Sequence, residues 1–280
     1  MLVILREMRV RRFGLRSALV LITVGTLAAS GGCETGGQRP ASTSGSPSVA
    51  APQQVSTACP SVSIDFKPKL ADQHVRCVLQ VNTSLALDVS SDPAWSFTLR
   101  NAGAVAQEFR EPTTEIGETG VAPLLQDIDN SGTPVLLIVV GSGGTGGEPM
   151  AVWRLTGPPT RFVRAGKIFG FRRFYQTPEG FFGNYAHSSA ASGIVQLYRW
   201  VDDKLVDVAL LDLQVAEMPP DPYSGHDWVR NGNVLCGLNN EDDPAGARAA
   251  RIAALQAAGI EPATAQQRFC TQPWVASIYK

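Results

Sequence analysis

The distribution of hydrophobic and polar positions divides the chain into three stretches of different character. An apolar run, Leu15–Leu27, lies near the N-terminus. Residues 34–58 are mostly Gly, Ser, Thr, Pro, Ala and Gln, a composition that cannot bury a core and predicts a flexible tether. The body runs from Cys59 to Lys280 and is long enough for one substantial domain.

Within the body, short apolar segments alternate with turn-forming residues, which predicts β-structure. The segments Trp95–Arg100 and Val105–Phe109 flank an Asn/Gly turn, as in a β-hairpin. The continuous apolar run Pro134–Val140 predicts a buried central strand. Further pairs of runs meet at turns around Gly157–Pro159, Thr177–Gly180 and Asp202–Asp203. This pattern favours an antiparallel all-β domain, built as a sandwich, barrel or propeller.

One helix is predicted near the C-terminus. Asp243 suits the N-cap position, and Pro244 suits the first helical position. The Ala-rich segment Ala247–Ala258 places Ile252 and Leu255 on one face, and Gly259 ends it.

The N-terminus has the layout of a secretory signal peptide. Four arginines precede the apolar run, and the small residues Ala28–Gly32 follow it. Cys33 comes next, and this order resembles the lipobox of bacterial lipoproteins, in which the thiol is lipidated. We expect a signal peptide over residues 1–32, a lipidated N-terminus and tether over 33–58, and a single β-rich domain over 59–280. The alternatives are an ordinary signal peptide cut near Ala28–Gly32 and an uncleaved membrane anchor.

The cysteine count fits an exported protein. With Cys33 assigned to lipid, four cysteines remain, an even number that suits an oxidising compartment. Of the three possible pairings we favour the one local in sequence, Cys59–Cys77 and Cys236–Cys270. Free buried thiols are the alternative. A zinc site is disfavoured, because no C-x-x-C spacing occurs and the chain has only three histidines.

Loss of the leader changes the charge of the chain. The full sequence has 24 basic and 25 acidic residues, and residues 1–32 hold five Arg and one Glu. The mature chain therefore has 19 basic and 24 acidic residues, a net charge of −5. This charge speaks against general nucleic-acid binding and suits a cationic partner.

The segment Asp127–Thr133 is the strongest internal motif. Asp127, Asp129 and Ser131 place oxygen-bearing side chains at alternate positions, and Thr133 offers its backbone carbonyl. Gly132 permits the sharp turn, so the loop can wrap oxygens around Ca²⁺. With two carboxylates, such a site is expected to be weak. A metal-free turn held by Asx hydrogen bonds is the equal alternative.

A glycine-rich loop follows the buried strand and matches the G-x-G-x-x-G pattern. We reject a dinucleotide site, because the segment after it predicts a strand rather than the helix that such a site needs. The loop remains a candidate binding surface. Its residues are Gly141, Ser142, Gly143, Gly144, Thr145, Gly146 and Gly147.

Two other clusters have structural explanations. Arginines and aromatic residues interleave over 161–175, where the simplest arrangement on strands puts aromatics inward and arginines outward. The run Ser224–Asp227 contains Ser, His and Asp, but such a local run is more often a capped turn than a catalytic site.

The Asp127–Thr133 loop before a buried strand resembles the D-x-D-x-D-G loops of integrin-type (FG-GAP or VCBS-like) β-propeller repeats. Combined with the lipobox, tether and cysteines, the chain resembles the xanthomonad immunity lipoproteins of antibacterial type IV secretion, which are similar to lysozyme inhibitors. The resemblance runs from about Trp95 to Leu213. It implies a modified β-propeller fold with a calcium site.

The expected function is that of a periplasmic or cell-surface lipoprotein without catalytic activity. It would act as an inhibitor or immunity protein against a lysozyme-like or other peptidoglycan hydrolase. The alternative is a structural or glycan-binding lipoprotein. An enzyme using His226 and Asp227 is the third and least favoured class.

Overall fold

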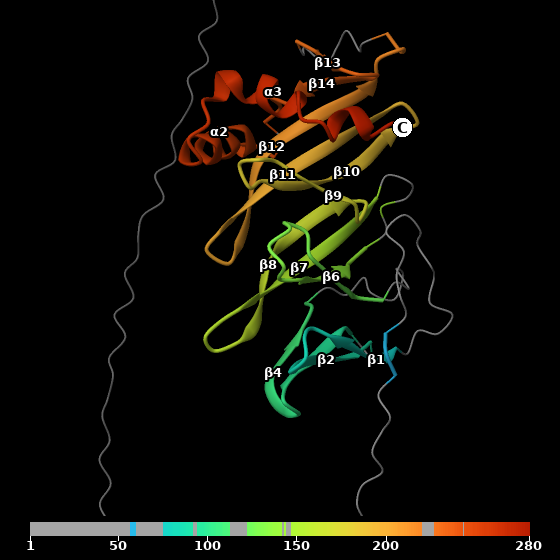
Figure 1. Ribbon diagram of the computed structural model, residues 1–280, viewed down its shortest axis with the longest axis vertical. Helices are drawn as coiled ribbons and strands as arrows, with labels where there is room; N and C mark the ends of the chain where they lie inside the picture. The colour runs from blue at the N-terminus through green and yellow to red at the C-terminus, as the bar shows by residue number, and fades with distance from the viewer. Residues whose placement is uncertain are drawn as a thin grey trace, which may run out of the picture. The chain divides into compact units, whose positions relative to one another are not determined.

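The computed structural model describes residues 57–59, 75–91, 94–112, 122–141, 143, 147–219, 227–242 and 244–280. The chain divides into two compact units, residues 1–52 and 53–280, and every described residue belongs to the second. The strands of this unit form three sheets in which all neighbours are antiparallel (Figure 1). The all-β prediction is therefore confirmed.

Each sheet is built mainly from strands that follow one another in the chain. The first sheet has the order β1 (Arg76–Gln80), β2 (Leu85–Ser90), β3 (Ser96–Asn101), β4 (Ala104–Arg110). The second has the order β5 (Leu124–Gln126), β6 (Val135–Val139), β7 (Glu148–Thr156), β8 (Arg161–Gly170). The third has the order β13 (Val229–Asn231), β14 (Val234–Leu238), β12 (Lys204–Val215), β11 (Ser192–Val201), β10 (Phe182–Ser189), β9 (Phe174–Gln176). Such meanders are also the building unit of propeller blades.

The predicted hairpin turns join the strands for identifiable reasons. Between β3 and β4, Ala102 and Gly103 both have positive φ, +48° and +85°. Positive φ at two successive turn residues matches the right-handed twist of the flanking strands. Between β11 and β12, Asp202 has a φ of +53°, a conformation that Asp tolerates better than most residues.

Three hydrophobic cores lie in series between the layers. The first, with Leu87 and Phe97, joins sheet one to one face of β6 through Leu136 and Ile138. The second contains Leu137 from the other face of β6 and reaches sheet three. Strand β6 is therefore buried on both faces, which confirms the predicted central strand. The third core lies between sheet three and the C-terminal helices.

Amide side chains help to join the sheets at their edges. Gln107 on β4 donates to the Phe162 carbonyl at 2.8 Å and accepts from the Phe162 amide at 2.7 Å. Asn184 on β10 donates to the Phe169 carbonyl at 3.0 Å. Both partners lie on β8, whose outer edge would otherwise expose free backbone groups.

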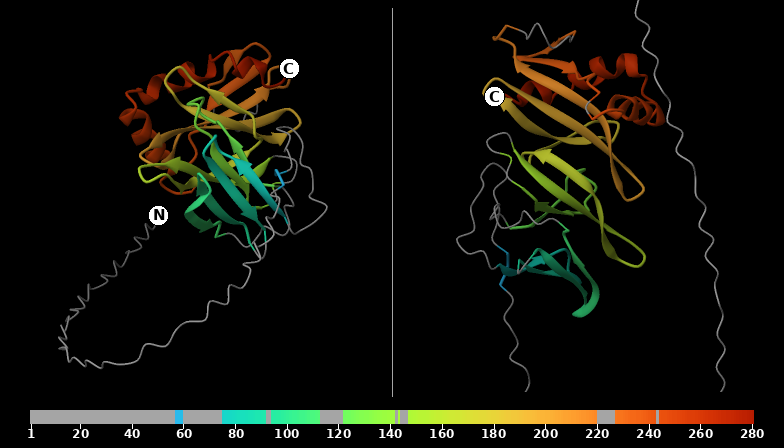
Figure 2. Two further views of the ribbon diagram at one scale, coloured as in Figure 1. Left: turned by 60° about the horizontal axis from the view of Figure 1, so that its bottom comes forward. Right: turned by 180° about the vertical axis from the view of Figure 1, so that it is seen from behind.

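The predicted helix is present as α2 (Ala247–Ala257), and α3 (Pro262–Cys270) and the short 3₁₀ helix η1 (Val275–Ser277) follow it. Figures 1 and 2 show α2 and α3 on one face of the third sheet. Helix α2 begins at Ala247, three residues later than Pro244, with Gly246 at its N-cap. The predicted N-cap Asp243 lies outside the described residues. The neighbouring Asp242 accepts hydrogen bonds from the backbone N–H groups of Gly246 and Arg248, both at 2.9 Å. Gly259 follows the helix with a φ of +73°, as expected for its end.

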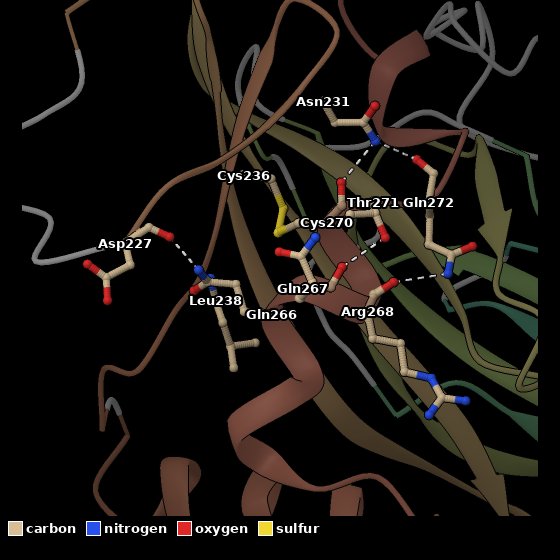
Figure 3. Close-up of a disulfide and its surroundings, with 10 residues drawn as sticks. All are labelled: Asp227, Asn231, Cys236, Leu238, Gln266, Gln267, Arg268, Cys270, Thr271 and Gln272. Carbon is tan, nitrogen blue, oxygen red and sulfur yellow. Dashed lines mark hydrogen bonds between the residues drawn. A yellow bond between two sulfur atoms is a disulfide. The ribbon is translucent and has the colours of Figure 1, made fainter.

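The four body cysteines form the two favoured disulfides, Cys59–Cys77 and Cys236–Cys270. Cys236–Cys270 links β14 to the end of α3 (Figure 3). Beside it, Asn231 donates to the carbonyls of Cys270 and Gln272, each at 2.9 Å, so that the bridge and this amide together hold the C-terminal segment on the sheet (Figure 3).

None of the helices in the described part of the chain has the length and hydrophobicity needed to span a lipid bilayer.

Candidate functional site

The Asp127–Thr133 loop connects the paired strands β5 and β6 and is held by its own carboxylates. Asp127 accepts the Gly132 amide at 2.8 Å and the Ser131 amide at 3.2 Å. Asp129 also accepts the Ser131 amide, at 3.1 Å. Gly132 has a φ of +79°, which a side chain would disfavour. The loop therefore makes the kind of Asx hydrogen bonds that the metal-free alternative expects.

A tryptophan from another sheet anchors this loop. Trp200 on β11 donates its indole N–H to Asp129 Oδ2 at 2.6 Å. Burial alone would raise the pKa of Asp129, but the hydrogen bonds from Ser131 and Trp200 outweigh it and hold this pKa below its ordinary value. The loop therefore carries an ionised, well-oriented carboxylate at neutral pH.

Arg154 extends this contact to the β11–β12 turn. Its guanidinium lies 4.6 Å from the centroid of the Trp200 ring, within cation–π range. Arg154 also donates to the Asp202 backbone carbonyl at 2.6 Å. The chain of contacts from Asp129 through Trp200 and Arg154 brings two acidic turns together. We call their aspartates the acidic edge: Asp127, Asp129, Asp202 and Asp203.

The donor set of the loop suits a hard cation only in part. Two carboxylates, the Ser131 hydroxyl and the Thr133 carbonyl are oxygen donors of the kind that Ca²⁺ prefers. Within the described residues, however, no cluster of three or more His, Cys, Asp or Glu side chains is placed to hold a metal. The carboxylates already satisfy backbone amides. A cation here would need carbonyl and water oxygens to complete its coordination.

The glycine loop lies between β6 and β7, and of its seven residues the structure describes Gly141, Gly143 and Gly147. The segment after the loop is β7. It is the strand that the sequence predicted in place of the helix that a dinucleotide site needs. Gly147 has a φ of +139°, and a Cβ there would come within 2.5 Å of the Gly170 Cα. The end of this loop therefore needs glycine for close packing against β8. Ser142, Gly144, Thr145 and Gly146 lie outside the described residues.

The structure corrects the expectation that the arginines of 161–175 all point outward. Arg172 is 2 % exposed and pairs with the buried Glu148 at 2.6 Å. Arg164 pairs at 3.0 Å with Glu111, which is 1 % exposed. Sequence reasoning missed both acids, because the arginines that pair with them lie 24 and 53 residues away.

A second cluster, of aromatic side chains, lies where β10 meets the C-terminal segment. The Tyr185 hydroxyl bonds to Tyr279 Oη at 3.1 Å and to His187 Nδ1 at 3.0 Å. The rings of Phe171 and His187 meet edge to face at 5.1 Å. Burial raises the pKa of both tyrosines, so their hydroxyls stay protonated. We call Phe171, Tyr185, His187 and Tyr279 the aromatic cluster.

The predicted lipidation site and most of the Ser224–Asp227 run lie outside the described part of the chain. Cys33 lies outside the described residues, and so do Ser224 and His226. The Asp227 backbone carbonyl accepts a hydrogen bond from Gln266 on α3 (Figure 3).

No protein-family model, curated protein or solved structure matches this chain.

Proposed function

We propose that this chain is an exported lipoprotein, anchored through Cys33, that binds and blocks a peptidoglycan hydrolase without catalytic activity of its own. Two disulfides suit an extracytoplasmic compartment, where such bridges persist. The leader and Cys33 supply the export and lipidation signals.

The proposal that the partner is a basic protein rests mainly on the acidic edge. Trp200 and Arg154 hold the Asp127–Thr133 loop and the Asp202–Asp203 turn beside each other, although they belong to different sheets. The mature chain also has a net charge of −5. An acidic protein attracts basic proteins at long range, and exposed carboxylates such as Asp202 favour their correct docking. Lysozyme-like hydrolases of basic charge are partners of this kind.

Affinity capture with a matched pair of variants tests the partner. The full chain in detergent should retain a basic lysozyme-like hydrolase, and Asp202→Asn should slow association several-fold, as removal of a rim charge does. Glu217→Gln is the control, because Glu217 follows the far end of β12 and is exposed. Equal association by both variants would exclude the acidic edge as the docking surface. No retention of any peptidoglycan hydrolase would exclude the proposed function.

We also propose that the Asp127–Thr133 loop binds Ca²⁺ weakly, with Kd in the range of about 10⁻⁴–10⁻³ M. Binding to the folded state alone adds about 1.4 kcal/mol at a tenfold excess over Kd. Thermal melts should therefore shift upward with calcium, and Asp129→Ala should abolish the shift. Identical melts with and without millimolar calcium would leave the loop as a metal-free turn.

A glycan-binding role is the second candidate, favoured by the aromatic cluster. Half-exposed Phe171 and Tyr279 lie next to the polar tips of Tyr185 and His187. Such amphipathic rings are common at binding surfaces. Sedimentation with purified peptidoglycan separates the candidates: loss of binding in Tyr279→Ala would support the glycan role, and absence of sedimentation would exclude it.

A further inference from the structure

The tips of two long hairpins, β7–β8 and β11–β12, project from the same side of the unit (Figure 1). A groove of about 420 Å³ lies here, and its volume falls in the range of small-molecule sites. Most of its lining comes from β7–β8, and Asp203 belongs to the β11–β12 turn. The chemically informative lining residues are Arg154, Thr156, Pro158, Pro159, Arg161 and Asp203.

Arg154 is a preorganised cation in this groove. Its guanidinium lies over the Trp200 ring, and one of its nitrogens donates to the Asp202 carbonyl. A guanidinium has five N–H donors, so most of them remain available for a ligand. Because neighbouring groups already orient this side chain, binding costs little additional side-chain entropy.

Arg161 and Asp203 face the same groove without neutralising each other. Neither side chain has an ion-pair partner among the described residues. Arg161 is exposed, whereas Asp203 is half-buried. A groove that holds an unpaired guanidinium and an unpaired carboxylate apart is complementary to a ligand that carries both charges.

We propose that this groove binds a small zwitterion, a free amino acid or a short peptide with free termini. The ligand's carboxylate pairs with the guanidinium groups of Arg161 and Arg154, for which bidentate contact is the preferred geometry. Its ammonium group donates to Asp203. Pro158 and Pro159 have no backbone N–H, so this part of the wall offers carbonyl acceptors, which suit an ammonium rather than an anion. The inference does not depend on the hydrolase partner.

Calorimetric titration of the full chain in detergent tests the proposal with four probes. Alanine and dialanine carry both charges, N-acetylalanine keeps only the carboxylate, and alaninamide keeps only the ammonium. We expect binding of alanine or dialanine, with each single-charge probe weaker by about tenfold or more. The tighter of the two zwitterions identifies an amino-acid or a peptide ligand.

Substitutions in the groove test which side chain pairs with which charged group of the ligand. Arg161→Gln and Asp203→Asn should each weaken the zwitterion by about tenfold, and Asp203→Asn should leave N-acetylalanine unchanged. Lys167→Gln is the control, because Lys167 is an exposed cation on β8 that does not line the groove. Three results would overturn the proposal: no heat with any probe at millimolar concentration, equal affinity for dialanine and N-acetylalanine, or equal losses in Lys167→Gln and Arg161→Gln. The probe comparison uses the unmodified protein and holds even if a variant folds poorly.

Discussion

At the scale of single residues, long polar side chains add hydrogen bonds between the sheets to the hydrophobic contacts of the cores. Gln107 satisfies both backbone groups of Phe162, and Glu111 joins Arg164 to the indole of Trp153 at 2.7 Å. Nothing in the local sequence distinguishes these residues from surface polar groups. Their roles depend on partners about 50 residues away, so only the folded structure reveals them.

Replacement of Gln107 by Leu tests the amide bridge. The change leaves the Phe162 N–H and C=O without partners in a partly buried site. An unsatisfied buried group costs about 1–3 kcal/mol, so we expect a loss of about 2 kcal/mol or more in urea unfolding. Gln256→Leu, at an exposed position of α2, is the control and should change stability by less than about 0.5 kcal/mol. Similar values for the two variants would mean that Gln107 does not join the sheets.

The lowered pKa of Asp129 predicts a pH dependence of stability. The folded-state pKa lies below the unfolded value of about 3.9. Ionised Asp129 therefore stabilises the fold above that pH, and this contribution is lost as the pH falls toward the folded-state pKa. Asp129→Asn should accordingly show a shallower decline in stability than the wild type below about pH 4. Thermal melts of both proteins from pH 7 to pH 3 measure this pH dependence. If the stability of Asp129→Asn declines as steeply as that of the wild type, Trp200 and Ser131 do not favour the ionised form of Asp129.

At the scale of elements, the hydrophobic pattern predicted long hairpins and missed short segments. Strands β3 and β4, β7 and β8, and β11 and β12 lie where alternation and turn residues placed them. Helix α3 escaped prediction because PATAQQRFC has little apolar periodicity. It is secured instead by Phe269 in the third core, by the Cys236–Cys270 bridge and by Asn231.

Loss of the Cys236–Cys270 bridge should therefore loosen the C-terminal layer. The bridged residues are 34 positions apart, and restriction of an unfolded loop of that length contributes about 3–4 kcal/mol. The double Cys→Ala variant should unfold at lower denaturant, with amide exchange rising first in α2 and α3. The matching variant at Cys59 and Cys77, 18 positions apart, should expose sheet one instead. Uniform exchange changes in both variants would argue against separate layers.

At the scale of the whole molecule, the sequence predicted the fold class but not which residues of separate hairpins form the candidate functional surfaces. Alternation with turn residues predicted an all-β body, and the two disulfides follow the local pairing. The groove and the acidic edge were not predicted, because each combines residues of separate hairpins. Asp129 meets Trp200 across 71 positions, and Arg154 meets Asp202 across 48.

Anchoring through Cys33 predicts the location of the whole protein. Cys33→Ala should move the protein from the membrane fraction to the soluble extracytoplasmic fraction, because the proposed lipid anchor depends on this one residue. Cys59→Ala is the control, since it removes a cysteine of the body and leaves the lipobox-like segment intact. Continued membrane association of a Cys33→Ala variant from which the leader has been cleaved would exclude lipid anchoring at this residue.

Titration of peptidoglycan hydrolysis tests the central claim most directly. The full chain is added to a basic lysozyme-like hydrolase acting on purified cell walls. We expect hydrolysis to fall to zero near equimolar protein, with Asp202→Asn requiring more protein and Glu217→Gln behaving as the wild type. Undiminished hydrolysis by every class of peptidoglycan hydrolase at excess protein would contradict an inhibitory function.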